Sequence, residues 1–167
     1  GFLSETPFRE IRMTTKFTAV LMGALLAVPA FDAGHAASGD ADAGENAYRQ
    51  CKSCHMIQSA DGENIVRGGR TGPNLWGVVG RDAGSIEDFR YSSSMEAAGE
   101  AGLVWTEEEF VAYVQDPTGY LREYLDDSGA RGKMSYRVRN EEDAVNLYAY
   151  LASVSPEPEM SGEDATN

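Results

Sequence analysis

Cysteine and histidine are scarce in this chain, which has only two of each among its 167 residues. The two thiols, Cys51 and Cys54, exclude a zinc site of four cysteines within one chain. A Cys2His2 site would need His35, which lies in a segment that we expect to be removed, unless a carboxylate replaced it. A thioredoxin-like dithiol needs a βαβ context, and no such alternation is present. A dithiol outside that context or a structural disulfide remains the alternative for this pair.

Positive charge is also scarce. The chain has 14 Lys and Arg against 27 Asp and Glu, a net charge of −13 at pH 7. Phosphate binding requires clustered Lys and Arg, so this composition argues against a nucleic-acid partner. The same acidity favours solubility and steers the protein towards basic surfaces.

Long hydrophobic runs are absent. The stretch from Phe17 to Val28 is mostly apolar, but the uncharged run between Lys16 and Asp32 is shorter than the roughly 20 residues that span a bilayer. A basic start, an apolar middle and small residues up to Ala37 are typical of a secretory signal rather than of an anchor.

We therefore predict a signal peptide over residues 13–36, starting at Met13 and cleaved after Ala36, with cleavage after Ala30 as the weaker alternative. Residues 1–12 do not fit a signal, and we expect them to be a non-native or mis-called leader. After cleavage, no stable membrane insertion is expected.

The two cysteines lie in the run Cys51-Lys52-Ser53-Cys54-His55, a pattern that attaches a c-type haem. Two thiols one helical turn apart can each form a thioether to a haem vinyl group. The histidine beside the second thiol can then bind the iron through a ring nitrogen. The motif predicts one covalent haem c with His55 as an axial ligand. This kind of attachment resembles the bacterial periplasmic case, which agrees with the signal peptide and predicts a periplasmic protein.

The pattern after the signal predicts one mostly helical domain over residues 37–155, followed by a disordered acidic tail over 156–167. Helices are expected over 40–50, 106–114 and 140–154, with Thr106 and Asn140 as N-caps and Glu109 completing a capping box. Ala43, Ala47 and Tyr48 share one face of the first helix, and Pro117 is expected to end the second. The apolar stripe of the third helix consists of Ala144, Leu147, Tyr148 and Leu151. The glycine-rich stretch 62–84 predicts loops, and no strand alternation is convincing. A core of such short helices would be thin, so we expect folding to depend on the haem.

The iron needs a second axial ligand opposite His55, and no other histidine would survive export, so methionine is the leading candidate. Met56 adjoins His55 and Met160 lies in the tail. Met95 falls in a short helix, where a buried methionine more often fills space, whereas Met134 falls in a loop that can swing over the haem.

The sequence from about Gly39 to Ser155 resembles the class I cytochromes c, close to the bacterial cytochrome c2 and c-550 group. The resemblance rests on the haem motif, on Thr71-Gly72-Pro73-Asn74-Leu75, on Lys133-Met134 and on helix positions at both ends of the domain. Those positions are Gly44, Tyr48, Leu147, Tyr150 and Leu151. The resemblance implies an all-α, single-domain class I cytochrome c fold, with short helices and long loops wrapped around one covalently bound haem.

The resemblance also implies roles for further residues. The Pro73 carbonyl would accept a hydrogen bond from His55, and Met134 rather than Met95 would be the distal ligand. Arg81, Tyr91 and Trp105 match positions that contact the haem propionates, and Tyr113 matches a buried tyrosine near the methionine. The same residue types also serve elsewhere as core aromatics, surface charges and turn residues.

The function implied by the resemblance is that of a soluble, monomeric one-electron carrier rather than an enzyme, because a His/Met haem has no open position for a substrate. It would shuttle electrons from a bc1-type complex to an oxidase, a reaction centre or a reductase, by transient docking of redox proteins at the haem edge. The alternative is a five-coordinate haem domain that binds a gas ligand or has weak peroxidase activity.

The chain departs from the family in its basic residues. Many members surround the exposed haem edge with lysines, whereas Lys52 and Lys133 are the only lysines after Ala37. We expect arginines to complete a small basic rim: Arg49, Arg131, Arg137 and Arg139.

Overall fold

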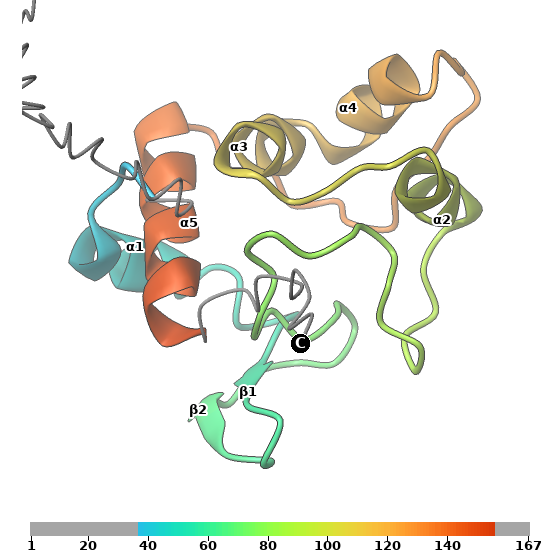
Figure 1. Ribbon diagram of the computed structural model, residues 1–167. Coiled ribbons are helices and arrows are strands. Elements are labelled where there is room, and N and C mark those ends of the chain that lie inside the picture. Colours follow the sequence, from blue (N-terminus) through green and yellow to red (C-terminus); the bar gives the residue numbers. More distant parts are fainter. Residues whose placement is uncertain (1–36, 156–167) are drawn as a thin grey trace, which may run out of the picture. The chain divides into compact units, whose positions relative to one another are not determined.

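The computed structural model describes residues 37–155. The predicted leader 1–12, signal 13–36 and tail 156–167 lie outside the described residues. Within residues 37–155 the helices are α1 (Ala41–Tyr48), α2 (Ser93–Glu100), α3 (Glu107–Gln115), α4 (Pro117–Tyr124) and α5 (Glu141–Val154), and the strands are β1 (Ile57–Gln58) and β2 (Asn64–Val66) (Figure 1). None of these helices is long and apolar enough to cross a membrane.

The helices predicted from the sequence are confirmed, and side-chain caps explain where they begin. Asp40 accepts a hydrogen bond from the Ala43 amide at 2.9 Å at the start of α1. Thr106 caps α3 at 3.3 Å, and Asn140 accepts from the Glu142 amide at 2.9 Å at the start of α5. Acidic residues fill the first turns of α3 and α5, where the helix dipole favours negative charge.

The predicted capping box at α3 is wrong in one half. The Thr106 amide donates to the Val104 carbonyl at 2.8 Å instead of to Glu109. The Glu109 carboxylate accepts a hydrogen bond from the Tyr120 hydroxyl of α4. The side chain is therefore used between two helices rather than within one.

Helix α4 was not predicted. Pro117 was expected to end α3, and it does, but the same residue is the first residue of α4, with Asp116 capping the Gly119 amide at 3.2 Å. Proline suits a first helical position because that position needs no amide hydrogen bond. The two short strands were also not predicted. They form an antiparallel hairpin in which Ile57 pairs with Val66, and strands this short carry no readable alternation.

Helices α1 and α5 come from opposite ends of the described chain and pack side by side (Figure 1). Gly44 makes this approach possible, because a Cβ there would lie 2.7 Å from Tyr150 Cβ and overlap the Asn146 carbonyl oxygen. Tyr48 packs against Tyr150, with ring centroids 5.6 Å apart. Ala43, which the helical pattern placed on the buried face of α1, is exposed.

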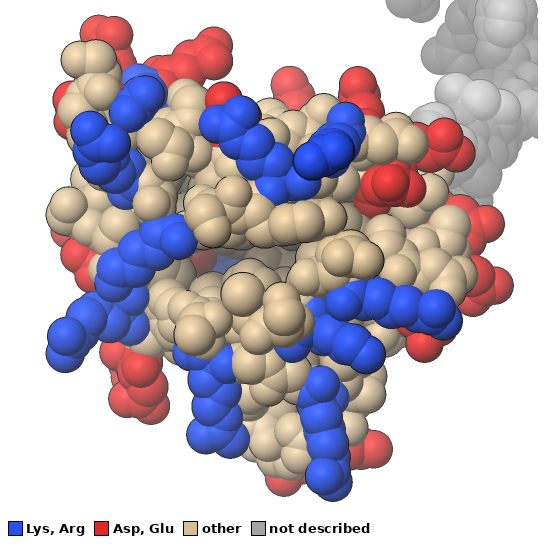
Figure 2. Space-filling view, turned by 180° about the vertical axis from the view of Figure 1, so that it is seen from behind, with Lys and Arg blue, Asp and Glu red and all other residues tan. Residues whose placement is uncertain are grey.

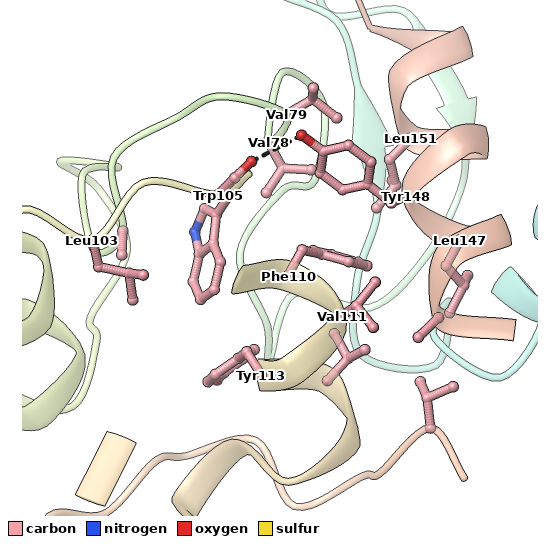
Figure 3. Packing of buried hydrophobic residues seen from close by; sticks show 14 of the residues in the cluster. Val78, Val79, Leu103, Trp105, Phe110, Val111, Tyr113, Leu147, Tyr148 and Leu151 are labelled. Carbon is pink, nitrogen blue, oxygen red and sulfur yellow. Dashed lines mark hydrogen bonds between the residues drawn. The ribbon is translucent and has the colours of Figure 1, made fainter. Parts of the chain in front are cut away.

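Most of the remaining core comes from α3, α5 and the segments that precede α3 (Figure 3), and α2 and α4 add Met95, Ala98 and Leu121. The predicted stripe of α5 is confirmed as buried, since Leu147, Tyr148 and Leu151 are at most 2% exposed. The Tyr148 hydroxyl donates to the Trp105 carbonyl at 3.1 Å, which ties α5 to the segment before α3. Trp105, Leu147 and Leu151 form part of the wall of a cavity.

Candidate functional site

A cavity of roughly 360 Å³ lies between the segment after α1, the glycine-rich loops, α3, α5 and the loop before α5. Every site residue predicted from the sequence lines it: Cys51, Cys54, His55, Pro73, Arg81, Tyr91, Trp105, Tyr113 and Met134. The fold therefore brings together residues that are spread over much of the chain.

The haem motif follows α1 in a series of turns. The Cys54 and His55 amides donate to the Cys51 carbonyl at 3.0 and 2.9 Å, so the backbone continues almost helically. Both sulfurs consequently reach the same cavity. Burial raises the pKa of the Cys51 thiol to about 11, whereas hydrogen bonds from Thr71 and Ser53 lower the pKa of the exposed Cys54 thiol.

The His55 ring is held in one orientation. Its Nδ1–H donates to the Pro73 carbonyl at 2.8 Å, which leaves the Nε2 lone pair as the metal-binding atom. Burial lowers the pKa of His55, and the bond to Pro73 opposes this shift only in part. The neutral ring that results has the protonation state that an iron ligand requires.

Glycine 72 lies directly against this ring. Its amide donates to the Cys54 carbonyl at 2.9 Å. A Cβ on Gly72 would lie 2.7 Å from His55 Nε2 and closer still to Cε1. Only glycine lets the loop pass so close to the ring, so the Thr71–Leu75 run holds His55 from two sides.

Two methionines line the cavity, Met95 from α2 and Met134 from the loop before α5. Met95 is 6% exposed and belongs to the core, whereas Met134 is half-buried. The neighbouring Lys133 fastens the Met134 loop, because its ammonium donates to the Arg90 carbonyl at 2.6 Å.

Arg81 is a half-buried cation that tests whether the cavity suits an anionic group. Its two Nη atoms donate to the Trp76 and Asn74 carbonyls at 3.0 and 3.2 Å, while its buried Nε has no hydrogen-bond partner within residues 37–155. Burial lowers its pKa. A guanidinium whose buried Nε–H has no partner fits a carboxylate of a bound group, such as a haem propionate.

Aromatic side chains form part of the wall. The Trp105 and Tyr113 rings lie 4.9 Å apart between centroids, and Figure 3 shows both side chains in the core. Burial raises the pKa of Tyr113 to about 12 and also raises the pKa of Tyr91. Both phenols are therefore neutral over the physiological range.

Several lining residues were not predicted as part of the site: Thr71, Val78, Phe89, Met95 and Val138. Val78 and Phe89 lie in irregular segments, where no periodicity marks a residue as inward-facing. The glycine-rich composition of that region indicated loops but not which side chains those loops would bury.

The donor set fits haem better than it fits zinc. Within residues 37–155 no group of three or more His, Cys, Asp or Glu side chains gathers in a way that could hold a metal ion. Instead, two thiols, one neutral imidazole, a thioether and a half-buried guanidinium surround a mostly apolar cavity. This combination suits a flat apolar macrocycle with two carboxylates.

Comparison with known proteins agrees with this interpretation. No protein-family model matches the chain. Over 118 residues it is 63% identical to cytochrome c2 of Rhodovulum adriaticum, an alignment covering 70% of this chain and 94% of the relative. It is 54% identical to cytochrome c-551 of Roseobacter denitrificans, covering 86% and 97%. The X-ray structure of cytochrome c2 from Rhodobacter sphaeroides superposes with a TM-score of 0.70 at 50% identity, covering 72% of this chain and 99% of that one.

The fold and the cavity define a haem protein of the all-α class I cytochrome c type. The chain belongs to the cytochrome c2 and c-550 family of electron-transport proteins. Its cofactor is one covalent haem c.

Basic side chains gather on one face in spite of the acidic composition. Figure 2 shows Lys and Arg around a hollow, with acidic residues mostly towards the margins. Seven exposed basic residues either line the cavity or adjoin a lining residue in the sequence, and we call them the basic rim: Arg49, Lys52, Arg70, Arg90, Lys133, Arg137 and Arg139. Arg131, expected in this rim, is exposed but adjoins no lining residue.

Proposed function

We propose that this protein is a soluble, monomeric periplasmic carrier of single electrons and not an enzyme. Cys51 and Cys54 would hold the haem through thioethers, and His55 and Met134 would be the two axial ligands. The bound haem supplies a reversible Fe(III)/Fe(II) couple, and thioether ligation raises its potential. The observation that carries the proposal is the fixed, neutral His55 ring facing a cavity that a loop methionine also lines.

The remaining wall residues would keep the site closed and anchored. Arg81 would bind a propionate through its free Nε, with Tyr91 and Trp105 nearby on the same wall. The mostly apolar lining would exclude water, which limits the rearrangement around the haem when its charge changes. Such a site favours fast outer-sphere transfer over substrate chemistry.

Docking would occur at the basic rim, close to Cys54, which is the exposed thiol of the pair. A partner that presents acidic side chains around its own redox centre would be attracted there. Weak, charge-steered contacts suit a carrier that must leave quickly. We propose a bc1-type complex as electron donor and an oxidase, a reaction centre or a reductase as acceptor.

Substitution of the two cavity methionines tests the axial ligand. In the oxidised holoprotein, Met134→Ala should abolish the far-red charge-transfer band of a methionine bound to Fe(III) while the haem stays attached. The matched control Met95→Leu should keep the band, because it replaces one core side chain by another of similar volume. An unchanged band in Met134→Ala would overturn the Met134 assignment. If wild-type protein lacked the band and bound carbon monoxide rapidly, the five-coordinate alternative would replace the carrier proposal.

A further inference from the structure

The residues that follow the predicted signal-cleavage site are held against the folded domain, and we call residues 37–40 the strap. Ala37 is half-buried and packs against the hydrophobic core. The Ser38 amide donates to one oxygen of the Glu107 carboxylate at 2.7 Å, and the Ser38 hydroxyl donates to the other oxygen. Glu107 lies in the first turn of α3, so the beginning of the strap is fastened to that helix.

The rest of the strap lies directly on α5. A Cβ on Gly39 would lie 2.5 Å from the Val145 carbonyl oxygen and 2.9 Å from Asn146 Cα, so a larger residue would force the strap away from the helix. The Asp40 amide then donates to the Asn146 side-chain carbonyl at 2.8 Å. The strap is thus pressed against one helix and hydrogen-bonded to two.

Hydrolysis at the predicted site has a requirement that the docked strap does not meet. The bond to be cut joins Ala36, which is outside the described residues, to Ala37. A protease cleft binds the residues on both sides of such a bond as an extended strand and uses their backbone hydrogen-bonding groups. Ala37 and Ser38 come first after the bond, and the Ser38 amide is already bonded to Glu107. The strap must therefore leave the domain before a protease can bind it.

We propose that the docked strap closes the processing site, so that the leader is removed only while residues 37–40 are undocked, and a domain that folds first keeps its leader. The inference rests on the signal peptide predicted over residues 13–36, and hence on the periplasmic location in the proposed function. It is separate from the axial ligands of the haem and from the docking partners.

Cleavage in turn favours docking of the strap. The C–N bond between Ala36 and Ala37 breaks, the Ala36 carbonyl carbon takes the hydroxyl group of a water molecule, and the Ala37 nitrogen takes the remaining hydrogen. At neutral pH the carboxylic proton passes to the new amine. The resulting ammonium is one residue away from Ser38 and so lies near the Glu107 carboxylate that Ser38 binds, which attracts it. Cleavage therefore favours docking, whereas docking prevents cleavage.

The test compares folded and unfolded precursor as substrates of purified bacterial signal peptidase. In a host depleted of this enzyme, the full chain would be exported, receive haem and keep its leader, and it is then extracted in detergent. Precursor without haem, checked by circular dichroism to be unfolded, is the open substrate. Gel shift follows release of the leader, and sequencing of the product locates the cut. Holo-precursor should be cut severalfold more slowly than haem-free precursor, because only its undocked fraction is accessible.

One substitution loosens the strap without changing the residues that the protease binds. Glu107→Ala removes the acceptor of both Ser38 hydrogen bonds, so its holo-precursor should be cut severalfold faster than that of wild type. Glu108→Ala is the matched control, because it removes the adjacent, exposed carboxylate of the same helix and should keep the wild-type rate. The haem-free forms of all three chains should be cut at one rate, since their straps are undocked.

Circular dichroism of the holo-precursors separates these effects from misfolding. The inference is overturned if folded wild-type precursor is cut as fast as haem-free precursor, or if Glu107→Ala and Glu108→Ala are cut equally fast. Cleavage after Ala30 would also overturn it, because the six residues from Phe31 to Ala36 would then separate the cut from the strap. A haem-free precursor that is not cut at all would refute the signal peptide as well, and with it the periplasmic part of the proposed function.

Discussion

At the scale of single residues, the site depends on how the His55 ring is held. The Pro73 carbonyl fixes the ring through Nδ1 at 2.8 Å, and Gly72 lies against its other atoms. Histidine, glycine and proline thus act as one unit, although they come from two separate segments of the chain.

Substitution of Gly72 tests this unit. In Gly72→Ala the new methyl group would overlap the ring, so His55 or the loop must shift and the bond to Pro73 is lost. We expect holoprotein stability to fall by about 1 to 3 kcal/mol, the usual range for overpacking, as measured by denaturant unfolding. Gly132→Ala is the matched control, because its nearest neighbour would be Leu121 Cδ1 at an ordinary 3.4 Å. Equal losses in the two variants would contradict the steric argument.

The Tyr113 phenol predicts a pH dependence. Its pKa rises from 10.0 to about 12 through burial, so folded protein holds this proton more tightly than the unfolded chain. The contribution is fully present below pH 10 and is lost as the pH rises towards 12. One pKa unit corresponds to about 1.4 kcal/mol, so we expect a loss of about 2 to 3 kcal/mol from this group over that window.

Denaturant unfolding of wild-type and Tyr113→Phe holoprotein, repeated from about pH 8 to about pH 12, would measure how much the Tyr113 phenol contributes to stability. The variant should lose less stability in the alkaline window than wild type. Tyr136→Phe removes an exposed phenol and should follow the wild-type curve. If Tyr113→Phe also followed it, the buried phenol would not be the titrating group.

The residues that carry chemistry were the easiest to predict from the sequence. Cys51, Cys54 and His55 can be recognised by their spacing in the sequence. They line the cavity together with Pro73, Arg81 and Met134. Phe89 and Val78 were missed because an apolar residue in an irregular segment has no periodic neighbour to show which way it faces. Met95 was weighed only as a ligand, and its place in the cavity wall follows from the tertiary fold.

At the scale of elements, the contact between α1 and α5 is the tightest requirement. Gly44 has no room for a side chain next to Asn146 and Tyr150. Asp40 adds a tie, because its amide donates to the Asn146 side-chain carbonyl at 2.8 Å. The two helices therefore approach at a distance that one methyl group would change.

Gly44→Ala should consequently destabilise the protein even though alanine is the better helix former. We expect a loss of about 1 to 3 kcal/mol in thermal or denaturant unfolding, after the helix-propensity gain of about 1 kcal/mol has been offset. Glu45→Ala changes the adjacent exposed position and should stay within about 0.5 kcal/mol of wild type. A neutral or stabilising Gly44→Ala would show that the helices can separate without penalty.

The helices with caps and apolar stripes were predictable, whereas α4 and the hairpin were not. Pro117 was interpreted only as the end of a helix. Asp116 and Pro117 in fact begin the next helix, α4, but an aspartate followed by a proline is equally typical of a turn. The Glu109 side chain was assigned to a local capping box, but its carboxylate instead accepts a hydrogen bond from Tyr120, 11 residues further along the chain. In the second case a contact between elements overrides a local rule.

At the scale of the whole molecule, charge is distributed unevenly. The net charge is −13, yet the basic rim surrounds the cavity on one face. For an acidic partner, the total charge repels over long distances, while the rim attracts at close range. The repulsion by the net charge and the attraction by the rim therefore oppose each other, and the repulsion acts over the longer distance.

This opposition predicts how electron transfer should vary with salt. The rate with an acidic partner, such as a purified bacterial bc1 complex, should first rise and then fall as ionic strength increases. At low salt, screening removes the long-range repulsion first. Near 0.1 M the screening length is about 10 Å, so only the rim still acts, and more salt weakens it. Stopped-flow measurement of the second-order rate constant would give the curve.

A charge reversal locates the effect. Arg90→Glu in the rim should lower the maximum, whereas Arg67→Glu, which is exposed and adjoins no lining residue, should mainly shift the low-salt limb. A rate that only rises with salt would mean that the rim takes no part in docking.

The pairing of α1 with α5 has a consequence for biosynthesis if the chain is exported as proposed. Asp40 and Asn146, which bond to each other, are 106 residues apart, so the Cys51–His55 segment would cross the membrane long before its closing helix. Until that helix arrived, the first helix would have no partner, and the thiols would stay accessible for attachment to haem. The placement of the closing helix at the far end of the domain would thus give cofactor insertion a time window, which ends when the last helix docks.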